Sequence, residues 1–255
     1  PKTTFGKALT LEAKKLGLTT SNDISLTDSS LTAGTDGLSL VSSEGSVSIN
    51  GGALTSQNSI NVSSAKDTTI SRTAVSSEGN DAEAGVFLSS SEGAVKVSDG
   101  SINSNGSVKL SAVTDAQLTN VSVSAKGTGE GSGVEVNSSQ GSVMIDAGQL
   151  DSQSSIRLTS AAGTQVMGAD LIAAGTGESE GLFINSNGGA VEVTSNTVSS
   201  GSVIDIASQK DASLTVESLN AAGKLDVESK EGSINVSSEA NGNTGGLQAA
   251  AENGS

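Results

Sequence analysis

The chain of 255 residues contains no cysteine, histidine, tryptophan or tyrosine, and it has a single proline and three phenylalanines. Without cysteine it can form neither disulfides nor thiolate metal sites. Without histidine it cannot use that residue as an acid, a base or a member of a catalytic triad. The sequence also lacks a phosphate-binding loop, a metal-binding motif and a nucleotide fingerprint. We therefore expect no catalytic residue, no cofactor and no bound metal, and we do not expect an enzyme.

Basic charge is also scarce, because 13 lysines and arginines face 28 acidic residues, which gives a net charge of −15. Nucleic acids and anionic membranes select basic surfaces, and single strands also select aromatic ones, so we expect no nucleic acid partner. The sequence has no run of about 18 apolar residues, which argues against direct insertion into a membrane. Glycine is abundant, with 32 residues, and suits frequent turns.

A repeat of 48 residues dominates the sequence. Its clearest columns are Val47, Val95, Val143 and Val191, and Gly45, Gly93, Gly141 and Gly189. The aliphatic residues keep their places while the polar residues drift, which is typical of a stacked architecture in which each unit buries its face against the next. We therefore predict an elongated rod. A disordered chain is less favoured, because it would not keep aliphatic residues in phase across four units.

Each 48-residue unit is predicted to contain two coils of a parallel β-helix. Aliphatic pairs begin at Ile60, Val86 and Val108, so the intervals between them are 26 and 22 residues. Short alternating segments lie between these pairs and are separated by turn dipeptides such as Asp99-Gly100, which indicates strands and tight turns. A hairpin meander is less favoured, because its strands would alternate in direction and need not repeat every 48 residues.

The predicted fold is one all-β domain over residues 1–255, a parallel β-helix of about ten coils. The coils begin at Leu16, Leu38, Ile60, Val86, Val108, Val134, Ile156, Leu182, Ile204 and Leu225. Residues 1–15 are expected to form a partial coil, and residues 246–255 a C-terminal tail. At about 4.8 Å per coil the rod would be roughly 50 Å long. Neither end carries a polar cap, so we expect the chain to be part of a longer array.

Three glycine-rich acidic segments, at residues 77–85, 125–133 and 173–181, occupy the same phase of the repeat and should project from one edge of the rod. They could form a contact strip or weak Ca²⁺ sites, for which the candidate residues are Glu78, Asp81, Glu83, Glu130, Glu178 and Glu180. They could instead be solvated loops that tolerate insertion. We favour solvated loops, because the carboxylates lack the fixed spacing of calcium-binding repeats.

Phe87 and Phe183 lie between aliphatic residues of their strands, so alternation points both rings outward. They could be exposed contacts, or they could pack beneath the neighbouring inserts, which is the interpretation we favour. Other outward positions are Lys96, Lys109, Arg157, Glu192 and Asp205, and they show no converging carboxylate pair.

Four aspartates share one turn position of the repeat: Asp23, Asp67, Asp115 and Asp211. Gly163 takes this position in one repeat. Aspartate at a turn commonly accepts a hydrogen bond from its own local backbone, so we predict a structural role for these residues.

The repeat phrase has two parts. The first part, D-x-x-[IL]-x-x-x-x-[VL], fits residues 67–75, and the second part, G-x-[VL]-x-[VI], fits residues 45–49 and 223–227. This phrase resembles the repeats of bacterial filamentous haemagglutinins, the large exoproteins of two-partner secretion that include adhesins and contact-dependent inhibition proteins. The resemblance covers nearly the whole chain. It implies a right-handed β-helix, export through an outer-membrane secretion partner, and a secreted or cell-surface location.

Two functions are compatible with such a rod. The first is a segment of an adhesin that attaches to host cells, other bacteria or matrix through a cell-surface or matrix ligand, with glycan as one candidate. The second is a passive stalk that presents a distal receptor-binding or toxin domain. A binding segment predicts a patch of shared chemistry along one face, whereas a stalk predicts none.

Overall fold

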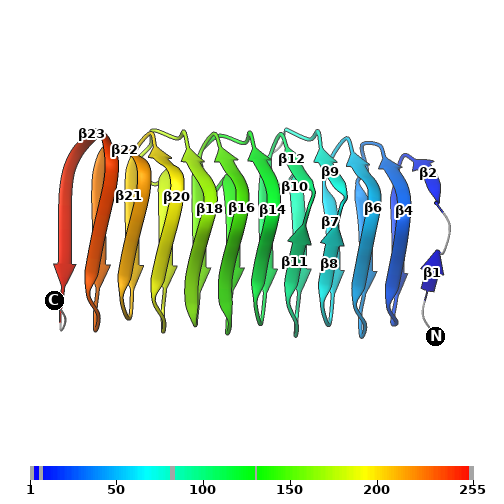
Figure 1. The fold of residues 1–255 in the computed structure, drawn as a ribbon. Helices are drawn as coiled ribbons and strands as arrows, with labels where there is room; N and C mark the ends of the chain where they lie inside the picture. The colour runs from blue at the N-terminus through cyan, green and yellow to red at the C-terminus, as the bar shows by residue number, and fades with distance from the viewer. Residues whose placement is uncertain (1–2, 6–7, 81–83, 130, 253–255) are drawn as a thin grey trace.

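The computed structural model describes residues 3–5, 8–80, 84–129 and 131–252. Over these ranges the chain forms 23 strands and no helix, and it winds into the rod shown in Figure 1. Successive turns pair in parallel and form a right-handed parallel β-helix of about ten coils, which confirms the predicted fold class. No element of this part of the chain meets the length and hydropathy of a membrane-spanning helix. The two ends of the chain lie at opposite ends of the rod (Figure 1).

Each coil has three faces. Face 1 consists of the short strands β3 (Leu16–Thr20), β5 (Leu38–Ser42), β7 (Ile60–Ser64), β10 (Gly85–Ser90), β13 (Ser107–Ala112), β15 (Gly133–Ser138), β17 (Ser155–Ser160), β19 (Gly181–Ser186) and β21 (Val203–Ser208). Six bent strands each cover faces 2 and 3: β4 (Ile24–Ala33), β6 (Val47–Ser56), β14 (Ala116–Ala125), β16 (Ser142–Ser152), β18 (Gly163–Ala173) and β20 (Val191–Ser200).

The remaining strands complete these faces. Those on face 2 alone are β1 (Thr3–Phe5), β8 (Thr68–Ser71) and β11 (Val95–Ser98), and those on face 3 alone are β2 (Thr10–Ala13), β9 (Ala74–Ser77) and β12 (Ser101–Ser104). At the C-terminal end of the rod, β22 (Ala212–Ser229) and β23 (Ile234–Ala251) each continue across faces 2, 3 and 1.

The strand register on face 1 reproduces every predicted coil start. Leu16 pairs with Leu38, Leu38 with Ile60, and the series continues through each predicted residue to Leu225. The series extends one step further, because Leu225 pairs with Leu247. Residues 246–251, which we expected to be part of a tail, are therefore strand. The reason is that L-Q-A repeats the alternation of a face 1 strand.

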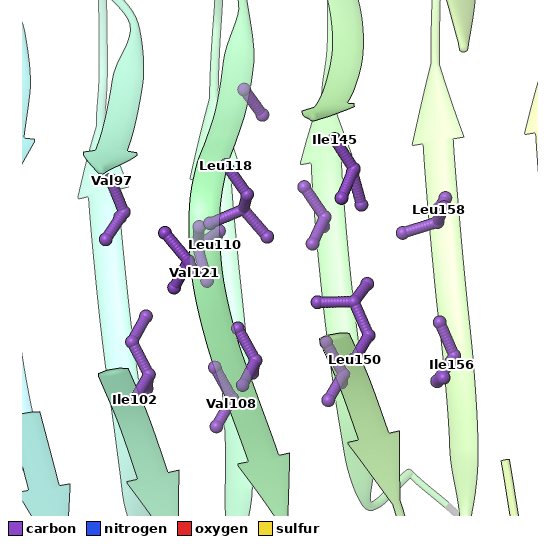
Figure 2. Close-up of a cluster of buried hydrophobic side chains, with 14 of the residues drawn as sticks. Val97, Ile102, Val108, Leu110, Leu118, Val121, Ile145, Leu150, Ile156 and Leu158 are labelled. Atoms are coloured by element: carbon purple, nitrogen blue, oxygen red, sulfur yellow. The ribbon is translucent and has the colours of Figure 1, made fainter. Parts of the chain in front are cut away.

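The interior is a set of aliphatic ladders, seen in the middle coils in Figure 2. Val47, Val95, Val143 and Val191 are buried on one ladder, as predicted. Smaller residues separate them: Thr68 lies between Val47 and Val95, and the later spacers are Ala116 and Thr164. The buried hydroxyl of Thr68 is 2.8 Å from the Ser64 Oγ, so its polarity is satisfied. This alternation of large and small residues is one cause of the double-coil period.

A column of buried serines lines the corner between faces 1 and 2. Its members are Ser42, Ser64, Ser90, Ser138, Ser160, Ser186, Ser208 and Ser229. In five of these turns the serine Oγ accepts the N–H of a glycine three residues later, as for Ser138 and Gly141 at 3.0 Å. The Ser160 Oγ lies instead 2.9 Å from the Thr164 Oγ1. Among the described residues, no buried side-chain nitrogen or oxygen lacks a hydrogen-bond partner.

The repeated glycines at this corner are required by close packing between coils. A Cβ on Gly45, Gly93, Gly141 or Gly189 would lie 2.6 Å or less from an atom of the preceding coil. At Gly93 the nearest atom is the carboxylate Oδ1 of Asp67, and at Gly141 the Oδ1 of Asp115 is among the nearest atoms. The glycine column therefore makes room for the aspartate column.

Those aspartates bind the next coil and not their own turn. The Oδ1 atoms of Asp23, Asp67, Asp115 and Asp211 accept N–H groups of Ser46, Ala94, Ser142 and Ser233 at 2.8 to 2.9 Å. The predicted structural role is right, but the predicted partner is wrong. Each acceptor reaches 22 to 27 residues along the chain, which only the stacking of coils makes possible. We call each of these bonds an aspartate clasp.

The corner between faces 2 and 3 turns through residues with left-handed backbone. Asp28, Asp99 and Asn120 have φ values of 47°, 52° and 52° there. Aspartate and asparagine tolerate this region, whereas Ala147, with φ of 59°, adopts it at a steric cost. Its conformation is held by the coils stacked on either side.

Candidate functional site

The most distinctive surface is a row of large outward side chains on face 1. We call it the face 1 row, and its members are Phe87, Lys109, Glu135, Arg157, Phe183, Asp205 and Asp226. Each is the direct strand partner of the next, so neighbours are about 4.8 Å apart along the rod. Alternation along each strand sends these side chains outward while the residues on either side of them enter the core.

Arg157 contacts both a candidate phenylalanine and one of the candidate acidic inserts. Its guanidinium carbon lies 4.0 Å from the ring centroid of Phe183, a cation–π contact. The same guanidinium donates a hydrogen bond to the backbone oxygen of Ser179, within the insert 173–181. Phe183 is half-buried. The predicted outward direction of this ring holds, and the group that lies over it is Arg157.

Phe87 occupies the equivalent place nearer the N-terminal end of the rod. It is half-buried, with Asn61 and Lys109 as its strand partners. Lys109 Nζ is 3.5 Å from Glu135 Oε2, and both side chains are more than 40% exposed. An ion pair this exposed contributes little to stability, so the pairing orders the surface more than it stabilises the fold.

A pair of carboxylates lies at the C-terminal end of the face 1 row, contrary to our expectation from the sequence. Asp205 and Asp226 are direct strand partners, and Lys224 Nζ is 2.6 Å from Asp226 Oδ2. Partial desolvation, together with the neighbouring Asp226 carboxylate, raises the pKa of Asp205. Their equal offset from the coil starts at Ile204 and Leu225 is the sequence signal that could have revealed this pair.

A shallow groove runs along the row next to these carboxylates. Its volume is about 230 Å³, and its lining includes Arg157, Phe183, Asn185 and Asp205. The groove thus combines an aromatic ring, a cation, an amide and a carboxylate on one continuous sheet surface. Such a mixture can hydrogen-bond polar ligands but contains no nucleophile placed beside a base.

The inserts 125–133 and 173–181 are joined by one carboxylate. Glu180 accepts the Gly177 N–H at 2.8 Å on Oε2, and the Gly129 N–H at 3.1 Å on Oε1. The Ser154 hydroxyl, from the coil between the two inserts, lies 3.2 Å from the same Oε1. The Gly177 N–H bond is the largest cause of a lowered pKa at Glu180, and partial desolvation opposes it. Sequence reasoning missed this link because Glu180 has no acidic counterpart in the repeat, where Ser132 and Ala84 take its position.

This geometry does not suit calcium. The atoms around the Glu180 carboxylate are N–H and O–H donors, whereas calcium requires converging oxygen acceptors. Glu78 and Glu178 are exposed, and Glu78 belongs to an insert four coils away from Glu180, roughly 19 Å along the rod. Asp81, Glu83 and Glu130 lie outside the described residues. In the part of the chain that the structure describes, no group of three or more acidic residues could hold a metal ion.

Comparison with protein-family models, with curated proteins and with solved structures finds no match for this chain.

Proposed function

We propose that this chain is a rod-like segment of a bacterial surface or secreted adhesin, in which it supplies reach between the cell and the point of attachment. The observation that carries the proposal is the unbroken face 1 register from Leu16 to Leu247. Every coil in this series stacks directly on the one before it, and the interior column is filled along the rod. Such a stack resists bending at any single coil, which is what a spacer requires.

A matched pair of deletions tests the spacer role. Removing residues 110–157 takes out two coils in phase and should shorten the rod by about 10 Å while keeping the fold. Removing residues 110–156 leaves one residue more, puts Arg157 into the inward position of Leu110, and should disrupt the neighbouring coils.

The length can be measured between two spin labels, because the chain has no native cysteine. Cysteines at Thr27 and Thr215 suit this purpose, since both residues are exposed on face 2. A folded 48-residue deletion whose label separation is unchanged would contradict the rod assignment.

The face 1 row favours a second function, direct attachment by this segment. Both half-buried phenylalanines, the groove and the contact of Arg157 with the insert 173–181 lie along one surface. Phe87→Ala combined with Phe183→Ala should abolish binding to cells, matrix or a glycan array if this row is the contact. Met167→Ser is the matched control, since Met167 is an exposed hydrophobic residue on face 2. If the double variant binds as well as the unchanged chain, direct attachment by this row is excluded and the spacer role is the one that remains.

We also infer a secreted or cell-surface location, reached through an outer-membrane secretion partner. The support is the resemblance of the repeat phrase to two-partner secretion exoproteins. Digestion of intact producing cells by an external protease tests the location, because a surface rod is cleaved or shed while a cytoplasmic marker survives.

A further inference from the structure

We propose that Asn187 is a site of spontaneous deamidation, at which the amide side chain converts to aspartate and isoaspartate. Asn187 precedes Gly188 in the turn that joins face 1 to face 2 after β19. Asparagine followed by glycine is the pair most prone to this chemistry, because glycine leaves the following backbone nitrogen unhindered. The chain has five Asn-Gly pairs. The structure describes the side chains of three of them, so Asn187 can be compared with Asn50 and Asn105.

The reaction needs no external reagent other than water. The Gly188 backbone nitrogen loses its proton and attacks the Asn187 Cγ, and the side-chain nitrogen leaves as ammonia. The resulting five-membered succinimide is then hydrolysed at one of its two carbonyls. One opening gives aspartate, and the other gives isoaspartate, in which the main chain runs through the former side chain.

Asn187 has the freedom that the attack requires. Asn187 and Gly188 are both exposed. Within the described ranges, neither the side-chain amide of Asn187 nor the backbone N–H of Gly188 has a hydrogen-bond partner. The backbone N–H of Asn187 donates to the Ser160 oxygen at 2.9 Å. The turn is also the one that lacks an aspartate clasp, because Gly163 takes the aspartate position opposite it.

Asn50, before Gly51, is held in a way that opposes the reaction. Its Oδ1 accepts Arg72 Nη2 at 2.7 Å, Arg72 Nε at 3.0 Å and the Ser71 hydroxyl at 3.1 Å. Rotation of the amide toward the Gly51 nitrogen would break these bonds, two of which come from a cation. Asn105, before Gly106, donates from Nδ2 to the Glu78 oxygen at 3.1 Å, and the attacking Gly106 N–H is itself bound to the Ser104 Oγ.

The fold cannot protect Asn187 by changing its neighbour. A Cβ on residue 188 would lie 2.6 Å from the backbone oxygen of Ala161 in the preceding coil. Close stacking therefore demands glycine at the position where glycine makes deamidation fastest. The product would add a carboxylate to a chain of net charge −15, and isoaspartate would lengthen the main chain between Ser186 and Gly189, whose Oγ and N–H are 3.1 Å apart.

The test is incubation of the whole folded protein at mildly alkaline pH, followed by peptide mass spectrometry that distinguishes aspartate from isoaspartate. Among the three pairs, Asn187 should convert first, at least about tenfold faster than Asn50 or Asn105, a difference of about 1.36 kcal/mol in activation free energy. In concentrated guanidinium the three rates should converge, because the hydrogen bonds that hold Asn50 and Asn105 are lost. Equal rates in the folded protein, or the same ranking in guanidinium, would overturn the proposal.

Two variants sharpen the test. Asn187→Gln should abolish conversion at this position, because glutamine would have to form a larger ring. Arg72→Gly removes two of the three donors to Asn50, and glycine accepts the left-handed backbone of residue 72, where φ is 51°. Deamidation at Asn50 should then rise toward that at Asn187, and an unchanged rate at Asn50 would show that hydrogen bonding is not the protecting factor.

Discussion

The fourth of the five equivalent turns lacks an aspartate clasp, and restoring the clasp should stabilise the rod. Gly163 stands where the other repeats have aspartate, and within the described residues no acceptor binds the Ala190 N–H opposite it. A Cβ on Gly163 would meet only Ala190 within 4 Å, its oxygen at 3.4 Å and its nitrogen at 3.9 Å. Gly163→Asp therefore fits without a clash, and its carboxylate can reach the Ala190 N–H as Asp115 reaches that of Ser142.

Two separable effects contribute to the expected gain. A hydrogen bond to a charged group stabilises by about 1.5–3 kcal/mol, and partial exposure of this corner places the clasp near the lower value. Replacing glycine at a compatible backbone position adds about 0.4–1 kcal/mol, because the unfolded chain loses freedom. We expect Gly163→Asp to stabilise by about 2 kcal/mol in total, and Gly163→Ala to show only the second part.

A local measurement is the appropriate assay, because a stacked repeat need not unfold in one step. The Ala190 amide should exchange its hydrogen about tenfold more slowly in Gly163→Asp than in Gly163→Ala, since 1.36 kcal/mol corresponds to a factor of ten. The reverse change, Asp115→Ala, should accelerate exchange at Ser142. If the aspartate and alanine variants of Gly163 protect Ala190 equally, the clasp does not contribute as we argue.

Four further outcomes follow from the geometry. Ala147→Gly should stabilise by up to about 1 kcal/mol by relieving left-handed strain, whereas Gly148→Ala should destabilise, since its Cβ would lie 2.2 Å from a carbonyl oxygen; urea denaturation checks both. The raised pKa of Asp205 means that the folded state favours its protonated form, so stability falls as pH rises from the unfolded value through the folded pKa, and Asp205→Asn should flatten that part of a urea-based pH profile. The lowered pKa of Glu180 has the opposite sign: its contribution is present above the unfolded value and lost as pH falls through the folded pKa, so acidification or Glu180→Gln should speed amide exchange at the two glycines it binds. Val143→Asp should cost several kcal/mol and unfold nearby coils, as a loss of circular dichroism on mild heating, because it buries an unpaired carboxylate.

The fold could be predicted from the sequence because an interior position makes the same demand in every coil. Val86 and Leu88 must be aliphatic wherever the chain returns to that phase, so spacing alone locates the coil starts. The outward neighbours are also predictable in principle, since Arg157 and Phe183 each follow a coil start by one residue. Recognising their contact requires only that equal offsets be compared between successive coils.

Contacts that depend on a partner in another coil could not be predicted in the same way. The donor to Asp115 is the N–H of Ser142, a backbone group that every residue type except proline provides, so nothing in the sequence identifies it. Glu180 differs again, because Ser132 and Ala84 take its position in the other inserts and its bonds depend on how two inserts meet. Periodicity locates these loops in the repeat but does not indicate the contacts between them.

The 48-residue period reflects a complementarity between unlike coils. In one coil of a pair, Asp115 is followed by the small Ala116; in the next, Gly141 is separated by one residue from Val143. The carboxylate fits only because Gly141 has no Cβ, which would lie 2.6 Å from it, and the valine stacks on the smaller alanine. A stack built from one kind of coil would place aspartate beneath aspartate or glycine beneath glycine and would lose these clasps. Two coils are therefore the smallest unit that can be added to or removed from the rod while every corner keeps its partner.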